Sequence, residues 1–322
     1  MKKVILSLVA VCLVIVLAGC QGPDSFHSAK SVIPELKSIP SSKSFDLEVL
    51  RNKQIKQPTG IAVTDSSILV ADAEEHCIHV LDLNYNYMTS FGSLGMGNSA
   101  FFRPAGIAWS NGMIYVVDSK NCRVQVFDEK YAFVKSYPLT KIDIDDPYSY
   151  IAVTDEGEIY VTATTALSQY AHIYHIHPND GRQSLIGNNI IGSVCTSGSE
   201  VLFAESRTIT HEAGTTVQIP GRNSLFSVNN DLMTNITEWP YKYSPVHMLK
   251  YNESIYAFSY RHSTLDRFTS DGSYVETLFR LPEDYLSFTC YAMAYNEKDN
   301  SFILSFPEER CMMRVFETSK DK

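Results

Sequence analysis

A repeat with a period of 46 residues constrains the fold of this chain more than any other feature. One stretch, starting at Pro58, runs PTGIAVTDSSILVADAEEHCIHVLD, and another, starting at Pro104, runs PAGIAWSNGMIYVVDSKNCRVQVFD. Asp72 and Asp82 of the first stretch recur in the second at the same spacing. Each unit contains four short runs of β-branched and aromatic residues divided by turn residues, a pattern that predicts one four-stranded blade of a β-propeller.

Four weaker copies follow, which gives six units in all. The last unit has only three strand-like runs, whereas the spare segment SFDLEVL, Ser44 to Leu50, precedes the first unit. Pairing the spare strand with the incomplete unit would remove two exposed sheet edges. The sequence therefore predicts an all-β fold over residues 44–322, a six-bladed β-propeller of four-stranded antiparallel blades, closed by the N-terminal strand completing the last blade.

The first two units resemble the NHL repeat. The motif elements are Pro104, Gly106-Ile107-Ala108, Val116-Val117-Asp118, Asn121-Cys122-Arg123-Val124 and Val126-Phe127-Asp128. The segment SFGSLGMGNSAFFRP, Ser90 to Pro104, is similar to the glycine-rich linker between blades of that family. The resemblance is close over residues 57–137 and architectural beyond them. The chain also looks like the six-bladed TolB-like propeller lipoproteins of bacteria.

The N-terminus has the layout of a lipoprotein signal peptide. Residues 1–19 contain two lysines, an apolar run from Val4 to Leu17 that is too short to span a membrane as a helix, and small residues before Cys20. The ending Leu17-Ala18-Gly19-Cys20 resembles the lipobox, which implies cleavage before Cys20 and a lipid anchor on that residue; an ordinary secretory peptide is the alternative. Residues 20–43 are predicted to be a flexible tether. We expect a bacterial cell-envelope location, on the outer membrane where the host has two membranes.

Charge and cysteine content exclude several classes of function. The formal net charge is −9, and it becomes two units more negative without Lys2 and Lys3, so binding to nucleic acid is not expected. The scattered cysteines form no zinc motif, and buried free thiols are predicted. A disulfide between Cys290 and Cys311 remains an alternative in an oxidising compartment.

The candidate ligand site is the face where loops emerge around the channel. In a propeller, the loop leading into each blade and the loop between its second and third strands share one face. Aromatic and arginine side chains in such loops suit stacking on planar groups and pairing with carboxylates. The predicted ligand-binding residues are Arg123, Tyr148, Trp239, Tyr241, Tyr243, Tyr260, Arg261, His262 and Arg310.

Other polar residues have competing interpretations. Asp72, Asp118 and Glu205 occupy matching blade positions and are interpreted as turn residues whose carboxylates accept backbone N–H groups. His175 and His177 lie on one side of a strand and could share a metal. We interpret them instead as solvated histidines on the blade surface, because the sequence offers no evident third ligand. The polar segment 204–222 is either a long binding loop or an extended hairpin.

These observations predict a lipid-anchored, non-catalytic binding or scaffolding module. We expect its partner to be an envelope protein or a glycan, and we predict no cofactor and no bound metal. A glycan or small-ligand receptor is one alternative. The other is a metal-dependent lactonase or lyase, because gluconolactonase-like hydrolases and peptide-amidating lyases share this architecture. No catalytic residue can be assigned from the motifs.

Overall fold

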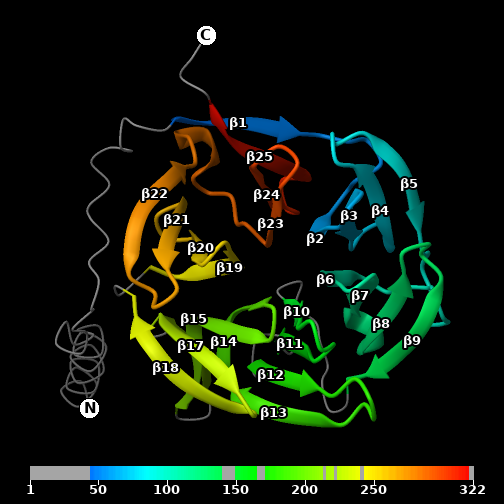
Figure 1. Ribbon diagram of the computed structural model, residues 1–322, viewed down its shortest axis with the longest axis horizontal. Helices are drawn as coiled ribbons and strands as arrows, with labels where there is room; N and C mark the ends of the chain where they lie inside the picture. The colour runs from blue at the N-terminus through cyan, green and yellow to red at the C-terminus, as the bar shows by residue number, and fades with distance from the viewer. Residues whose placement is uncertain are drawn as a thin grey trace, which may run out of the picture.

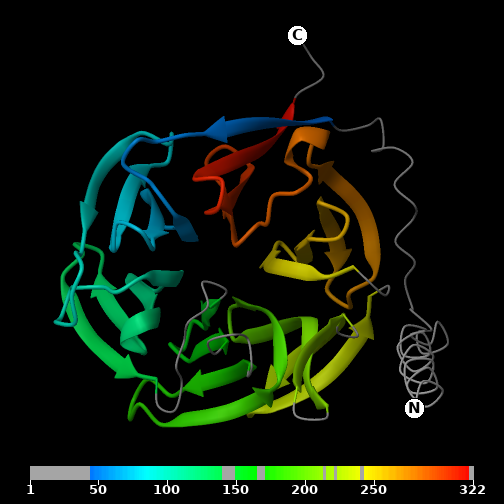
Figure 2. The same ribbon diagram turned by 180° about the vertical axis from the view of Figure 1, so that it is seen from behind.

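The computed structural model describes residues 44–139, 149–164, 171–212, 215–220, 223–239 and 243–318. Six antiparallel sheets stand in a ring around a central channel (Figure 1), and the ring is equally clear from behind (Figure 2). Residues 1–43, which include the predicted signal peptide, Cys20 and the predicted tether, lie outside the described residues. Within the described part of the chain, no helix is long and apolar enough to span a membrane.

The first three blades follow one another along the chain, each with its strands in sequential order from the channel outward. Blade 1 contains β2 (Pro58–Val63), β3 (Ser67–Asp72), β4 (Cys77–Asp82) and β5 (Tyr87–Phe91). Blade 2 contains β6 (Pro104–Ser110), β7 (Met113–Asp118), the short 3-10 helix η1 (Ser119–Asn121), β8 (Arg123–Asp128) and β9 (Phe133–Pro138). Blade 3 contains β10 (Ile151–Val153), β11 (Ile159–Thr164), β12 (Ala171–Ile176) and β13 (Gln183–Asn188).

The next three blades include one extra strand and the closure of the ring. Blade 4 contains β14 (Ile190–Ser197), β15 (Glu200–Glu212), β16 (Thr215–Pro220), β17 (Ser224–Asn229) and β18 (Leu232–Glu238). Blade 5 contains β19 (Pro245–Tyr251), β20 (Ser254–Ser259), β21 (Thr264–Thr269) and β22 (Tyr274–Arg280), and the 3-10 helix η3 (Glu283–Tyr285) leads to blade 6. Blade 6 contains β23 (Ala292–Asn296), β24 (Ser301–Phe306), β25 (Cys311–Thr318) and, on its outside, β1 (Ser44–Leu50).

Closure by the N-terminal strand is confirmed. β1 pairs antiparallel with β25 along its full length, with Leu47 opposite Val315. Phe45, Leu47 and Val49 are partly buried against the apolar cluster between blades 5 and 6, while Asp46 and Glu48 between them are exposed. One strand from each end of the chain thus completes the same sheet, which leaves no gap in the ring.

The core consists of apolar layers between blades. Among the described residues, six clusters of buried side chains occur, and each joins two neighbouring blades. The second strand of a blade is covered on both sides, so β3 is buried at every position, whereas the outermost β5 is largely exposed. This difference explains why second strands have continuous apolar sequences and outer strands do not.

Glycine near the start of an inner strand allows neighbouring blades to approach closely. A Cβ atom at Gly60 would lie 2.2 Å from the carbonyl oxygen of Ala105, and one at Gly106 would lie 2.5 Å from that of Ser149. Both contacts join one blade to the next, and neither is compatible with a side chain. The repeated glycine of the sequence motif is therefore a packing requirement of the ring.

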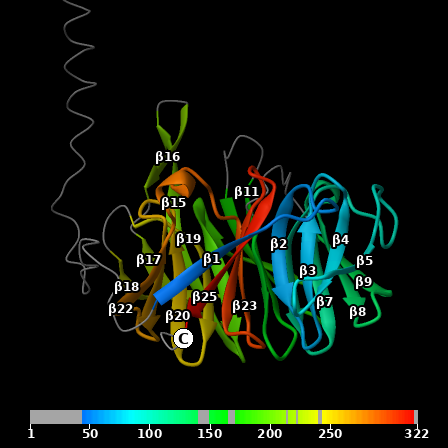
Figure 3. The ribbon, with the colours of Figure 1, turned by 90° about the horizontal axis from the view of Figure 1, so that it is seen from above.

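Segment 204–222 corresponds to the hairpin alternative. β15 continues beyond its blade and pairs with β16 from Arg207 opposite Pro220 to Glu212 opposite Thr215. Viewed from the side, this hairpin projects from the loop face of the ring (Figure 3).

Asp72 and Asp118 are turn residues, as predicted. Both side chains are fully buried. Asp72 accepts backbone N–H groups from Lys56 at 2.6 Å and Glu75 at 3.0 Å, and His79 Nε2 lies 3.2 Å from its second oxygen. Burial opposes ionisation, but the hydrogen bonds from His79 and the backbone outweigh it and lower the pKa of Asp72 below its usual 3.8.

Replacing Leu47 by aspartate is expected to lower the free energy of unfolding by about 2 kcal/mol, because β1 would lose apolar burial at the closing sheet. Urea unfolding followed by tryptophan fluorescence measures the change. Asp46→Ser, on the exposed side of the same strand, is the matched control and should leave stability nearly unchanged. Equal effects of the two substitutions would contradict a role of β1 in closure.

The Asp72→Asn variant is expected to be less stable than the wild type by about 2 kcal/mol at neutral pH, because an amide cannot replace an ionised acceptor of several N–H groups. The lowered pKa means that this contribution is present above the unfolded-state pKa and is lost as the pH falls through the folded-state value. The stability gap, measured by urea unfolding across the pH range, should therefore narrow below about pH 4. Exposed Asp65→Asn should show no such pH-dependent gap.

Candidate functional site

The loops expected on one face do share it. In several blades the segment leading into the blade is hydrogen-bonded to the loop between its second and third strands, as in Lys120 N to Phe102 O at 3.1 Å in blade 2 and Tyr260 N to Ser244 O at 3.0 Å in blade 5. The corresponding bond in blade 1 joins Ala73 N to Gln57 O. We call this end of the ring the loop face.

Two of the predicted ligand-binding aromatics are core residues. Trp239 and Tyr243 are fully buried and pack edge to face, with ring centroids 5.5 Å apart. Trp239 donates its Nε1–H to Gly272 O, and the Tyr243 hydroxyl donates to Asp266 at 2.8 Å. The expectation that these two side chains are exposed on the loop face is wrong, because both are buried and their polar ends find partners inside blade 5.

Three other predicted residues lie at the surface of the loop face. Tyr260 and Arg261 are exposed, and His262 is partly buried. Burial, and then the neighbouring Arg261 and Arg280, lower the pKa of His262. Arg310 is exposed and pairs with Glu74 of blade 1 at 2.8 Å, so it links blade 6 to blade 1. Tyr148 and Tyr241 lie outside the described residues.

Arg123 holds a loop in place. Its guanidinium donates to the buried Asp118 carboxylate at 2.8 Å and to the carbonyl oxygens of Gly97 and Ala100. Asn121 donates to Gly95 O at 2.8 Å, again on the linker between blades 1 and 2. The Asn-x-Arg element therefore fixes the conformation of this linker, which we call the 92–103 loop.

The 92–103 loop exposes apolar side chains that the sequence reasoning passed over. Leu94 is 63% exposed, Met96 is 80% exposed and Phe102 is 42% exposed. Phe102 packs edge to face on the ring of His76, with centroids 5.7 Å apart. We call these three residues the apolar patch. The sequence does show large apolar residues between glycines in this segment, but the segment was interpreted only as a linker between blades.

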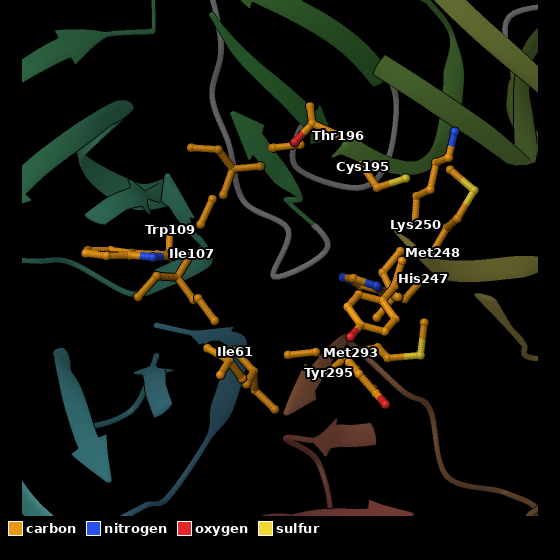
Figure 4. A pocket seen from close by; sticks show the side chains of 18 of the residues that line it. Ile61, Ile107, Trp109, Cys195, Thr196, His247, Met248, Lys250, Met293 and Tyr295 are labelled. Atoms are coloured by element: carbon orange, nitrogen blue, oxygen red, sulfur yellow. The ribbon is translucent and has the colours of Figure 1, made fainter. Parts of the chain in front are cut away.

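The channel contains a cavity of about 310 Å³ lined by the inner strands of all six blades. Figure 4 shows side chains from these strands around the open centre. The wall is mainly aliphatic and includes Ile61, Ile107 and Met293, while Lys250 and Tyr295 supply polar groups. Because the lining residues belong to the middle and end of each inner strand, the cavity occupies the half of the channel away from the loop face.

His247 is the least satisfied polar side chain of this wall. Its Nδ1 atom is buried without a hydrogen-bond partner, and its ring packs edge to face on Tyr150 at 5.2 Å. Burial lowers the pKa of His247 to about 4, so the ring is neutral at physiological pH. A neutral imidazole can accept or donate one hydrogen bond to a molecule that enters the cavity.

The alternative disulfide between Cys290 and Cys311 is absent. Among the described residues, both are buried free thiols. His175 is only 6% exposed, so the interpretation of a solvated histidine is wrong for this residue. Glu158 lies beside His175 and His177, a neighbour that the sequence spacing could not reveal.

Comparison with known proteins identifies one repeat and the fold. Residues 101–127 match the NHL repeat model. No curated protein sequence matches the chain significantly.

Solved structures match most of the chain at low sequence identity. Virginiamycin B lyase from Staphylococcus aureus is 16% identical, with a TM-score of 0.54 over 85% of this chain and 99% of that one. A gluconolactonase from Xanthomonas campestris is 9% identical, with a TM-score of 0.60 over 90% and 95%. A chain of the nidogen/laminin complex is 13% identical, with a TM-score of 0.51 over 74% and 85%.

Two enzymes and a chain of a protein complex therefore resemble this chain at similarly low sequence identity. At such identities the likeness shows the fold alone. The matched repeat and the ring of six sheets agree with each other. The chain is a six-bladed β-propeller in which residues 101–127 match the NHL repeat.

Proposed function

We propose that the chain is a non-catalytic module that binds a protein of the bacterial cell envelope through the loop face. The observation that carries this proposal is the apolar patch of the 92–103 loop. Leu94, Met96 and Phe102 expose large apolar side chains close together in sequence, and exposed apolar groups rimmed by polar ones are typical of protein-binding surfaces. The neighbouring β3–β4 loop supplies Glu74 and Glu75 to the rim.

The rigidity of the 92–103 loop supports the same function. Hydrogen bonds from Asn121, Arg123 and Gln125 hold its backbone from Gly95 to Ala100. A loop fixed before binding loses little conformational freedom in the complex, so more of the contact energy appears as affinity. The long, flexible side chain of Met96 can adapt to the shape of a partner.

A small-ligand receptor is the second candidate, and the channel cavity favours it. The cavity is lined by the inner strands of six blades, and its wall includes His247, whose buried Nδ1 atom has no hydrogen-bond partner. A cavity that combines apolar side chains with a few polar groups is a common form of small-molecule site. Among the described residues, the channel side chains form no group of three metal ligands, so neither candidate invokes a central ion.

Site-specific photocrosslinking in the native cells tests the first candidate. A photoreactive residue at position 96 is expected to give an adduct with one protein species, because Met96 is the most exposed member of the apolar patch. The same probe at Leu185, an exposed apolar position on the outer strand β13, is the matched control and should give none. Arg123→Ala should reduce the adduct several-fold, because the 92–103 loop loses the two hydrogen bonds that Arg123 donates to its carbonyl oxygens.

The outcome also separates the two candidates. A probe at Trp109, in the cavity wall, reports on ligands inside the channel. An adduct at position 109 with a small molecule, and none at position 96, would favour the receptor. Equal protein adducts at positions 96 and 185 would contradict a specific site on the loop face.

We further propose that Cys20 carries the lipid that anchors this module to the membrane. Support comes from the charged start, the apolar run and the Leu-Ala-Gly-Cys sequence, all in order. A tether of residues 20–43 would let the propeller reach a partner near the membrane.

Cys20→Ser is expected to remove the lipid and move the chain from the membrane fraction, in which the wild type should be found. Fractionation with metabolic labelling by a fatty-acid analogue measures both effects. Cys12→Ser, within the segment to be removed, is the matched control and should keep the label. A labelled Cys20→Ser chain would show that the anchor lies elsewhere.

A further inference from the structure

A cluster of three side chains that could bind a metal lies on blade 3, apart from the residues that line the channel cavity. Glu158 comes from the turn between β10 and β11, and His175 and His177 come from the end of β12. His175 Nε2 lies 2.6 Å from Glu158 Oε2, and His177 Nδ1 lies 3.1 Å from the same oxygen. All three ligand atoms lie within 4.8 Å of one another. Turns between first and second strands emerge opposite the loop face, so this cluster is separate from the apolar patch.

The surrounding residues hold His175 in one orientation. Its ring is stacked on Tyr160, with centroids 4.4 Å apart and an interplanar angle of 8°. Its Nδ1 lies 2.5 Å from Oδ1 of Asp231, which comes from the turn between β17 and β18 of blade 4. A carboxylate on Nδ1 keeps the proton there and directs the Nε2 lone pair toward the other ligands. Asp231 thereby contributes from a neighbouring blade to a site on blade 3.

Glu158 is also held in place before any ligand arrives. Its backbone N–H donates to Thr154 Oγ1 at 3.2 Å, and its carbonyl accepts Thr154 N–H at 3.0 Å. The carboxylate is partly buried, with 30% of its side chain exposed. Solvent can therefore reach the cluster. The backbone of the three residues is fixed by the strand and the turn in which they lie.

We propose that Glu158, His175 and His177 bind one divalent transition-metal ion of the zinc class, with Asp231 orienting His175. Two imidazole nitrogens and one carboxylate are a common three-ligand set for zinc, and they suit transition metals better than calcium or magnesium. Bonds of about 2.0–2.2 Å require ligand atoms roughly 3.3 Å apart, so the side chains need only small outward movements. The fourth position is open to water or to an external ligand.

Arg182 competes with the metal for His177. Its Nη2 lies 3.0 Å from His177 Nε2, and a guanidinium can only donate, so that nitrogen accepts and Nδ1 carries the proton. Metal binding at Nδ1 requires the other tautomer, in which Nε2 carries the proton and no longer accepts from Arg182. Arg182 is exposed and can move away. Removing its positive charge should therefore strengthen metal binding.

Calorimetric titration of Zn²⁺ into the purified, chelator-treated full-length protein tests the site. One equivalent is expected to bind to the wild type, and His177→Gln should abolish this binding. Asp231→Asn should weaken it by about 10- to 100-fold, because the orienting carboxylate is lost. Arg182→Gln should tighten it, a result that a cluster serving only as a structural ion-pair network would not give.

His262→Gln, on the loop face, is the matched control and should bind zinc like the wild type. Circular dichroism confirms that each variant is folded, and the visible spectrum of Co²⁺ in place of zinc reports nitrogen and oxygen ligands independently of heat. Absence of stoichiometric binding in the wild type, or unchanged binding in folded His177→Gln, would overturn the proposal. Binding that Arg182→Gln weakens would overturn the assignment of Nδ1 as the ligand atom.

Discussion

Apolar packing between neighbouring blades is the interaction on which the rest of this structure depends. A single four-stranded blade cannot bury both of its faces, and each of the six apolar clusters joins two blades. Because every blade needs both neighbours, the ring must close. β1 and β25, from opposite ends of the chain, close the ring by pairing in the sheet of blade 6. The stability of the first and last blades therefore depends on this one sheet.

The same constraint determines where polar chemistry can occur. Side chains on the middle strands are enclosed between blades, so a polar group there needs a partner within the protein, as Asp72, Asp118 and Asp266 have. Groups that can meet an external molecule remain at the two ends of the ring, on the outer strands and in the channel. The apolar patch lies at the loop face, and the cluster of Glu158, His175 and His177 lies at the opposite end. The two proposed sites can therefore act independently.

Sequence reasoning predicted which loops share the loop face, and it missed which side chains are exposed there. Tyr260, Arg261 and Arg310 are exposed on the predicted face. Trp239 and Tyr243 belong to the core because their polar ends bond inside the protein, which no periodicity reveals. Arg123 matched a family motif, yet its contacts hold the 92–103 loop and thereby present Leu94 and Met96 to solvent.

The sequence alone determined the number of blades, the closing strand and the role of the repeated aspartate, because these depend on local periodicity and on turns within about 50 residues. Tertiary structure alone decided which side chains from different blades meet. Asp231 lies 56 residues from His175 and Arg310 lies 236 residues from Glu74, yet both pairs are in direct contact. The physical reason is that ring closure sets the distance between blades, and contacts across a blade boundary depend on that distance rather than on any spacing along the chain.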